Sequence, residues 1–244
     1  MINSAIRRTA AAALGSVLLA GCHPKKAPEP VSPDTVYQRA QQAYANGKNG
    51  RAATLFEQFL ALSPGDPRVP TATYLTARAR MGTHEYVTAA AQFLRVVNDF
   101  PADTLARTAR MGLCEAYVHL SPRPQLDQDY TNSAIAYCES YGQLYPNTPQ
   151  ADRAALMVQA LQSKLAQKEY ETGVFYFRRK AYDASVIYFT RAAAEFPQTP
   201  FAPAALLKLY EAYAAVGYVE ERDAAKARLL KDYPSSPEAK SLAG

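Results

Sequence analysis

The chain has 244 residues, 48% hydrophobic and 20% charged, which is the range of globular proteins and enough for one or two ordinary domains or one repeat array. Its formal net charge of +5 falls by two if Arg7 and Arg8 leave with the N-terminal leader described next. So mild a charge, without a basic cluster interleaved with stacking aromatics, argues against nucleic acid as a partner.

Residues 1–21 have the pattern of a secretory signal, in which two arginines precede the short apolar stretch Ala10–Leu19. About ten apolar residues are too few to span a bilayer, which needs about 20. The stretch ends in Leu19-Ala20-Gly21-Cys22, which resembles the lipobox of bacterial lipoproteins. The resemblance implies cleavage before Cys22, a covalent lipid on its sulfur and no other cofactor. An ordinary signal peptide with a coincidental cysteine is the alternative.

The residue after Cys22 is His23 rather than aspartate, which favours the outer membrane over the inner one. Residues 22–33 form a proline-rich, charged segment that we interpret as an extended tether between the lipid and the folded part.

Helix-ending prolines divide the remaining chain into five similar units. They are Pro64, Pro101, Pro146, Pro197 and Pro234, at intervals of 37, 45, 51 and 37 residues. Two of the intervals are close to the tetratricopeptide period, and the longer two indicate insertions. The sequence therefore predicts an all-α, tetratricopeptide-like α-solenoid of about five helix pairs. Its span is residues 34–236, with units at about 34–64, 68–101, 102–146, 150–197 and 200–234, followed by a short tail at 237–244.

Two of the units depart from a simple helix pair. Ser121–Asp129 contains two prolines and several charges, so we expect an exposed loop between the helices of unit three. No helix breaker occurs between Asp152 and Lys180, which predicts one helix of about 28 residues in unit four. Because this helix is longer than its expected partner Tyr182–Glu195, its first half must project or be covered by something else.

Motifs for catalysis and metal binding are missing from the sequence, so we expect a protein that is not an enzyme and holds no metal. Cys114 and Cys138 lie in unit three on opposite helices of one hairpin. An oxidising compartment permits a disulfide between them. Two buried thiols are the alternative, and the sequence does not decide between them.

Stacked helix pairs form a groove lined by their first helices, and aromatic and arginine side chains there suit an extended peptide with an aromatic end and a carboxylate. The residues expected to line it are Tyr37, Gln41, Tyr44, Arg78, Arg107 and Arg110. The alternative is that the tyrosines pack in the core and the arginines are solvated, and both interpretations stay open here.

The lipobox, the tether, the five units and the long helix before YETGVFYFRRKAYDASVIYF together resemble the BamD family, the lipoprotein subunits of the outer-membrane β-barrel assembly machinery. The resemblance implies a non-enzymatic scaffold, lipid-anchored at the periplasmic face of the outer membrane. The expected partners are a periplasmic POTRA domain of a BamA-like barrel protein and the C-terminal signals of unfolded outer-membrane proteins.

The family also suggests where the barrel subunit docks. Many members carry an arginine where this chain has Tyr188, and Arg191 lies about one turn further along the same helix. We therefore assign Tyr188, Arg191, Arg178 and Arg179 to this surface. The alternative function is another envelope tetratricopeptide lipoprotein, such as a pilotin that escorts a secretin, which would lack the long helix.

Overall fold

A computed structural model describes residues 31–243, so the leader, the lipobox with Cys22 and most of the tether lie outside the described residues. Within this range every regular element is a helix, and Ser32–Gly244 forms one compact unit. The helices are α1 (Pro33–Ala45), α2 (Asn49–Leu62), α3 (Val69–Gly82), α4 (Tyr86–Asp99), α5 (Thr104–Leu120), α6 (Asp129–Leu144), α7 (Pro149–Arg178), α8 (Tyr182–Glu195), α9 (Phe201–Val216), α10 (Val219–Asp232) and α11 (Pro237–Ala243).

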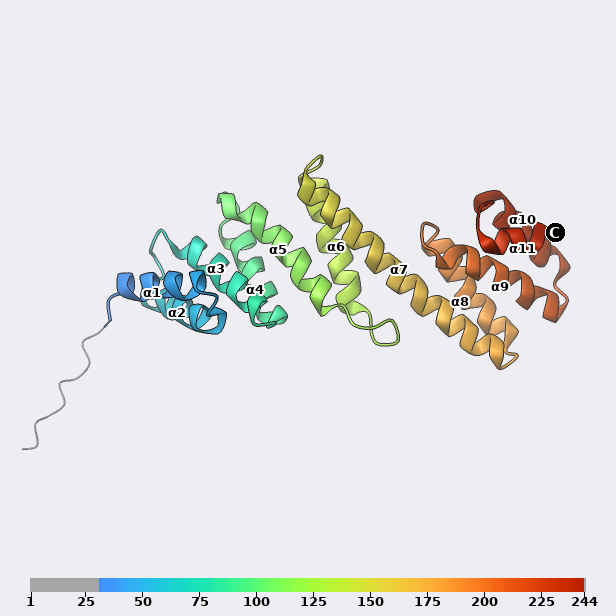
Figure 1. Ribbon diagram of the computed structural model, residues 1–244, viewed down its shortest axis with the longest axis horizontal. Coiled ribbons are helices and arrows are strands. Elements are labelled where there is room, and N and C mark those ends of the chain that lie inside the picture. Colours follow the sequence, from blue (N-terminus) through green and yellow to red (C-terminus); the bar gives the residue numbers. More distant parts are fainter. Residues whose placement is uncertain (1–30, 244) are drawn as a thin grey trace, which may run out of the picture. The chain divides into compact units, whose positions relative to one another are not determined.

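Each helix packs against the next one in the chain, which gives five antiparallel pairs from α1 to α10 (Figure 1). The chain is thus a tetratricopeptide-like α-solenoid. Short polar side chains start several helices by accepting a hydrogen bond from an otherwise unpaired backbone N–H group. Ser32 accepts from Thr35 at 3.2 Å, Asp103 from Leu105 at 2.8 Å, and Thr148 from Ala151.

The core repeats with the units. Alanines lie where the two helices of a pair cross closely, and phenylalanines lie one turn further along. All of these residues are completely buried: Ala52, Ala89, Ala134, Phe56, Phe93 and Phe189. The turn inside four of the five pairs contains a residue with positive φ, which glycine adopts at no steric cost. Gly47 and Gly217 fill it in units one and five, with φ of 68° and 82°. His84 and Lys180 hold the same conformation in units two and four.

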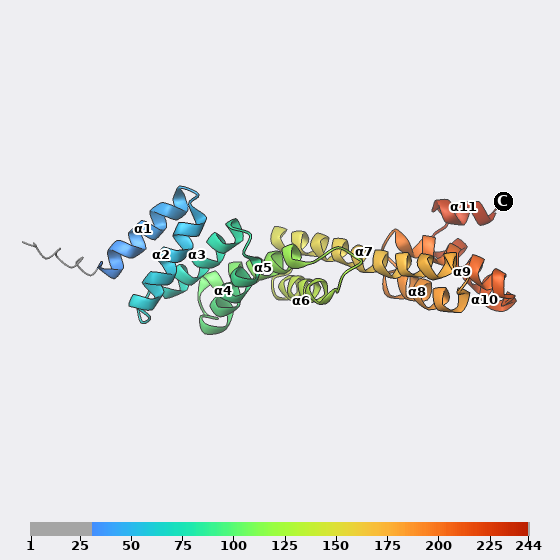
Figure 2. The same cartoon turned by 90° about the horizontal axis from the view of Figure 1, so that it is seen from below.

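The long helix α7 has 30 residues, close to the predicted length and about 45 Å at 1.5 Å per residue. It packs along α5 and α6 and then along α8 and α9, so two successive helix pairs share it (Figure 2). The first half of α7 is therefore covered by the preceding unit. The second half forms the hairpin with α8 that the sequence predicted.

The loop between α5 and α6 is largely exposed, as predicted, and it also contacts α7 through hydrogen bonds. Lys164 of α7 donates to the Ser121 carbonyl at 3.3 Å and to its Oγ at 2.7 Å, and burial lowers the pKa of Lys164. Lys168 donates to the Leu126 carbonyl at 2.7 Å. Gln128 is buried and donates to three carbonyls of the loop itself. The loop is thus fixed because α7 presents cations to its carbonyl oxygens.

The C-terminal tail forms α11, which packs against α9 and α10 and buries Ala239. As expected, the tail adds no helix pair, but this single helix covers the end of the last one. Among residues 31–243, no helix combines the length and apolar character that a bilayer span requires.

Candidate functional site

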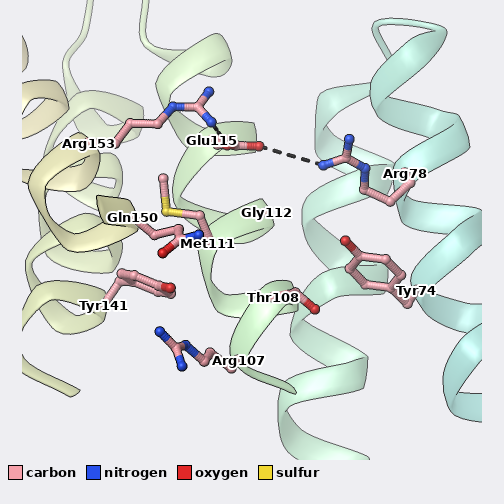
Figure 3. A pocket seen from close by; sticks show the side chains of 10 residues that line it. All are labelled: Tyr74, Arg78, Arg107, Thr108, Met111, Gly112, Glu115, Tyr141, Gln150 and Arg153. Atoms are coloured by element: carbon pink, nitrogen blue, oxygen red, sulfur yellow. Dashed lines mark ion pairs between the residues drawn. The ribbon is translucent and has the colours of Figure 1, made fainter. Parts of the chain in front are cut away.

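The first candidate site is a cavity of about 450 Å³ between α3, α5, α6 and α7 (Figure 3). Its lining residues are Tyr74, Arg78, Arg107, Thr108, Met111, Gly112, Glu115, Tyr141, Gln150 and Arg153. Three arginines and one carboxylate stand among aromatic and apolar side chains. A concave, largely apolar space with a few polar groups is the usual form of a ligand site.

Glu115 joins two of the arginines across three helices. Its Oε1 lies 3.0 Å from Arg153 Nη1 on α7, and its Oε2 lies 4.0 Å from Arg78 Nη1 on α3 (Figure 3). The Glu115 side chain is only 15% exposed. Burial by itself lowers the pKa of Arg78, but a hydrogen bond with Tyr44 and the charge of Glu115 are among the effects that leave this pKa raised. Arg78 therefore remains charged.

The third arginine, Arg107, has no such partner. Its guanidinium lies 5.0 Å from the centre of the Tyr145 ring, a cation–π contact. Among residues 31–243, no carboxylate lies within ion-pair distance of Arg107. The buried ring of Tyr141 packs 5.0 Å from Tyr145 and forms the neighbouring wall. Within the described range, Arg107 is thus the cavity arginine without a carboxylate partner, and its guanidinium is left for a ligand.

Local sequence fixes this geometry. Arg107, Met111 and Glu115 are spaced by four residues, so they lie along one face of α5. Gly112 on the same helix allows the close approach of α4, because a Cβ there would lie 2.5 Å from Phe93 Cζ. A disulfide bond between Cys114 and Cys138 links α5 to α6, and the two Cα atoms are 4.9 Å apart.

The predicted groove is only partly realised by this cavity. Arg78 and Arg107 line it, whereas Tyr44 packs against the core of the first unit. Gln41 and Arg110 are not among the lining residues. Tyr37 is 7% exposed and belongs to the core instead.

Tyr37 follows the alternative interpretation because its ring has close aromatic neighbours. It packs against Phe56 and Phe59 with ring centres 5.8 and 4.9 Å away, beneath the Arg68 guanidinium. The other eight lining residues of the cavity escaped the sequence prediction, among them Tyr74, Glu115, Tyr141 and Arg153. The four-residue spacing on α5 was a signal for Glu115, whereas Arg153 depends on how α7 packs.

The second candidate site is a ladder of side chains across the hairpin of α7 and α8. Its aromatic members are Phe175, Tyr176 and Tyr188, with ring centres 5.2 and 5.3 Å apart, and the two tyrosine rings are stacked. Arg179 lies 3.5 Å above the Phe175 ring, and Arg191 lies 5.9 Å from the Tyr188 ring. We call these five residues the aromatic ladder.

The ladder presents both apolar and cationic groups to solvent. Phe175 is 48% exposed, and hollows of about 340 and 370 Å³ lie on its two sides. Arg191 is 3.8 Å from the half-buried Glu169, whose pKa is raised by burial although Arg191 lowers it. Arg178, expected at the same surface, lines the hollow beside Tyr170 and is not a member of the ladder.

The described part of the chain offers one arrangement that suggests catalysis, the pair of Ser121 and Lys164. The Ser121 hydroxyl lies 2.6 Å from Thr131 Oγ1 while its oxygen accepts from Lys164. Lys164 also donates to the Ser121 carbonyl, so its two contacts with Ser121 hold the end of α5 against α7. Over residues 31–243, no group of three or more histidine, cysteine or acidic side chains has metal-binding geometry.

Tandem helix pairs with a cavity between successive units define a solenoid scaffold, a class of protein that binds partners along its surface. Residues 30–229 match the model of a family described as YfiO, outer membrane lipoprotein, and the chain belongs to this family.

Individual relatives support the assignment. The chain is 26% identical over 231 residues to the outer membrane protein assembly factor BamD of Caulobacter vibrioides, covering 93% of this chain and 76% of that protein. It is also 26% identical over 222 residues to BamD of Rickettsia prowazekii, covering 90% and 88% of the two chains. A solved tetratricopeptide protein of Bacteroides fragilis shares 12% identity, with a TM-score of 0.48 and coverage of 86% and 96%; so weak a likeness carries no argument.

Proposed function

We propose that this chain is a non-enzymatic, lipid-anchored assembly factor for outer-membrane proteins, with Cys22 as the site of lipid attachment. Its membership of an outer membrane lipoprotein family and its BamD relatives support this role. In this proposal the cavity binds a client polypeptide, and the aromatic ladder binds a periplasmic POTRA domain of a BamA-like barrel protein.

The observation that carries the client-binding part is the unpaired Arg107 among aromatic walls. A guanidinium forms two parallel hydrogen bonds with a carboxylate, and such charge-assisted bonds are the stronger ones. The aromatic rings of the cavity suit an aromatic last residue. The fitting ligand is therefore the C-terminal end of an extended, unfolded barrel protein.

Peptide binding tests this part directly. A labelled octapeptide with a C-terminal phenylalanine is titrated into the purified protein, once with a free carboxylate and once with a C-terminal amide. We expect the carboxylate form to bind at least about tenfold more tightly, because the amide loses a charged hydrogen bond. Arg107→Ala abolishes this preference, and the control Arg110→Ala keeps it. Equal binding of the two peptides contradicts the proposal.

The docking part rests on the aromatic ladder. The exposed ring of Phe175, the two half-buried tyrosine rings and the two flanking cations form an anchor of the kind that dominates protein interfaces. They fit an apolar patch with acidic neighbours. In this proposal Arg191, about one turn beyond Tyr188 on α8, supplies the cation for an acidic group of the partner.

A pull-down in mild detergent followed by mass spectrometry tests the partner. We expect a stoichiometric barrel protein with tandem periplasmic domains, lost in Arg191→Ala and retained in the control Arg95→Ala on α4. Recovery of a secretin instead would favour the pilotin alternative and contradict the proposal.

A further inference from the structure

The position of Glu115 has a consequence for the kind of ligand that the cavity accepts. Three arginines line the space, which by charge alone suits phosphate and other multiply charged anions. The half-buried Glu115 carboxylate already occupies two of them, with Oε1 3.0 Å from Arg153 and Oε2 4.0 Å from Arg78. A carboxylate of the protein itself thus neutralises part of the site.

We propose that Glu115 is a specificity-determining residue of the cavity and shifts its preference from doubly charged ligands toward singly charged carboxylates. This inference rests on the proposed client-binding function and names the charge class of the ligand. The negative charge of Glu115 repels any incoming anion, and the repulsion grows in proportion to the ligand's charge. The three guanidinium groups and the Glu115 carboxylate give the cavity a net charge of +2, which would be +3 without Glu115. Glu115 therefore weakens the attraction for a dianion about twice as much as the attraction for a monoanion.

The burial of Glu115 strengthens the effect of its charge on the choice of ligand. The Glu115 side chain is 15% exposed and is held from two sides, by α3 and by α7. It therefore stays close to a ligand in the cavity, in surroundings where solvent screens charges less than at an open surface. If the loss of this charge raises the affinity for a monoanion by about tenfold, the affinity for a dianion rises by about a hundredfold.

The competing role for Glu115 is that of a brace between units. Through Arg78 and Arg153 it connects helices of units two, three and four, and a pure brace would affect stability without affecting the choice of ligand. The two roles are separated by the ratio of affinities for two anions, which a brace leaves unchanged.

The test compares Glu115→Gln, Glu115→Asp and the wild type, with Glu139→Gln on the exposed side of α6 as a charge-matched control. The probes are the octapeptide with a free carboxylate and the amidated octapeptide that ends in phosphotyrosine, a dianion at pH 7.5. Glu115→Gln is expected to shift the ratio of the two affinities about tenfold toward the phosphopeptide. Glu115→Asp keeps the charge and the wild-type ratio, as does Glu139→Gln. Thermal melting identifies any variant that does not fold.

Three results overturn the inference. An unchanged ratio in Glu115→Gln leaves Glu115 as a brace. Weaker binding of both probes, or the same shift in Glu115→Asp, means that Glu115 only holds the arginines in place. Acetate and inorganic phosphate at constant ionic strength, read out as stabilisation against heat, repeat the comparison without peptides. If no peptide binds, the client-binding proposal fails, and the two small anions still decide the role of Glu115 by the same ratio.

Discussion

The contact between Gly173 of α7 and Phe189 of α8 predicts an unusual result for a glycine-to-alanine change. In a helix interior this change normally stabilises a protein by about 1 kcal/mol, because alanine loses less backbone entropy on folding. Here the added methyl group would lie 2.5 Å from Phe189 Cε1, whereas carbon atoms normally approach to about 3.5–4.0 Å. The ring must therefore move by about 1 Å, or the helices must separate.

The ring has little room to do so. Phe189 is completely buried, and the rings of Tyr170 and Phe177 lie 5.7 and 6.3 Å from its centre. Overpacking of this kind costs about 1–3 kcal/mol. After the gain from alanine is subtracted, Gly173→Ala should lower the free energy of unfolding by about 0–2 kcal/mol.

Gly142 on α6 is the matched control, because a Cβ there meets no atom within 4 Å. Gly142→Ala should stabilise by up to about 1 kcal/mol, so the two variants should differ by about 1–3 kcal/mol, roughly 2–12 °C in melting temperature. Denaturant unfolding and calorimetry measure the difference. The smaller side chain of Phe189→Leu should let Gly173→Ala become neutral or favourable. Equal stabilisation by the two alanines would refute the tight crossing of α7 and α8.

Three further changes test the energetics. Replacing Cys114 and Cys138 by serine should cost about 3 kcal/mol, since their bond closes a loop with a sequence separation of 24, and a cost near zero in denaturant unfolding would contradict this. Burial raises the pKa of Glu169, so its carboxyl group binds a proton more tightly in the folded state than in the unfolded state. The contribution of Glu169 to the free energy of unfolding therefore falls as the pH rises through its folded pKa. Glu169→Gln should therefore stabilise at pH 7 but not at pH 4, and an equal effect at both values in pH-dependent unfolding would refute this assignment. Lys164→Met removes two hydrogen bonds to Ser121 and should speed amide exchange in the loop between α5 and α6, whereas unchanged exchange would show that the loop does not depend on them.

The repeat pattern could be predicted from the sequence because each signal was local. Proline after an aromatic residue ends a helix wherever it occurs, and the lack of breakers before Lys180 predicted the long helix directly. The conformation of the turns was harder to predict, since His84 and Lys180 adopt the positive φ for which only glycine is a reliable sign.

The cavity was only partly predictable, because its walls come from residues far apart in the chain. Arg78, Glu115 and Arg153 meet only when α3, α5 and α7 stack, and no spacing within one helix encodes that. Tyr37 was predicted to line the groove, but the structure places it in the core. A tyrosine on a first helix has the same pattern whether it faces a groove or the core, and the neighbouring Phe56 and Phe59 draw it inward.

The long helix also explains how the two candidate sites relate to each other. Arg153 of the cavity and Phe175 of the aromatic ladder lie on α7, 22 residues apart and thus about 33 Å along one continuous helix. Side chains of a client bound in the cavity are therefore too far away to contact a partner bound at the aromatic ladder. If the two bindings cooperate in assembly, they do so because α7 holds them at a fixed distance.

Breaking the helix tests this argument. Ala160 is exposed between the two sites, and proline there removes a backbone hydrogen bond and bends the helix, at a cost of about 3 kcal/mol. Ala160→Pro should keep both peptide binding and barrel-protein binding when each is measured alone, but lose assembly activity in reconstituted membranes. The control Ala160→Gly weakens the helix by about 1 kcal/mol without bending it and should assemble normally. Normal assembly with Ala160→Pro would show that the fixed distance is not required.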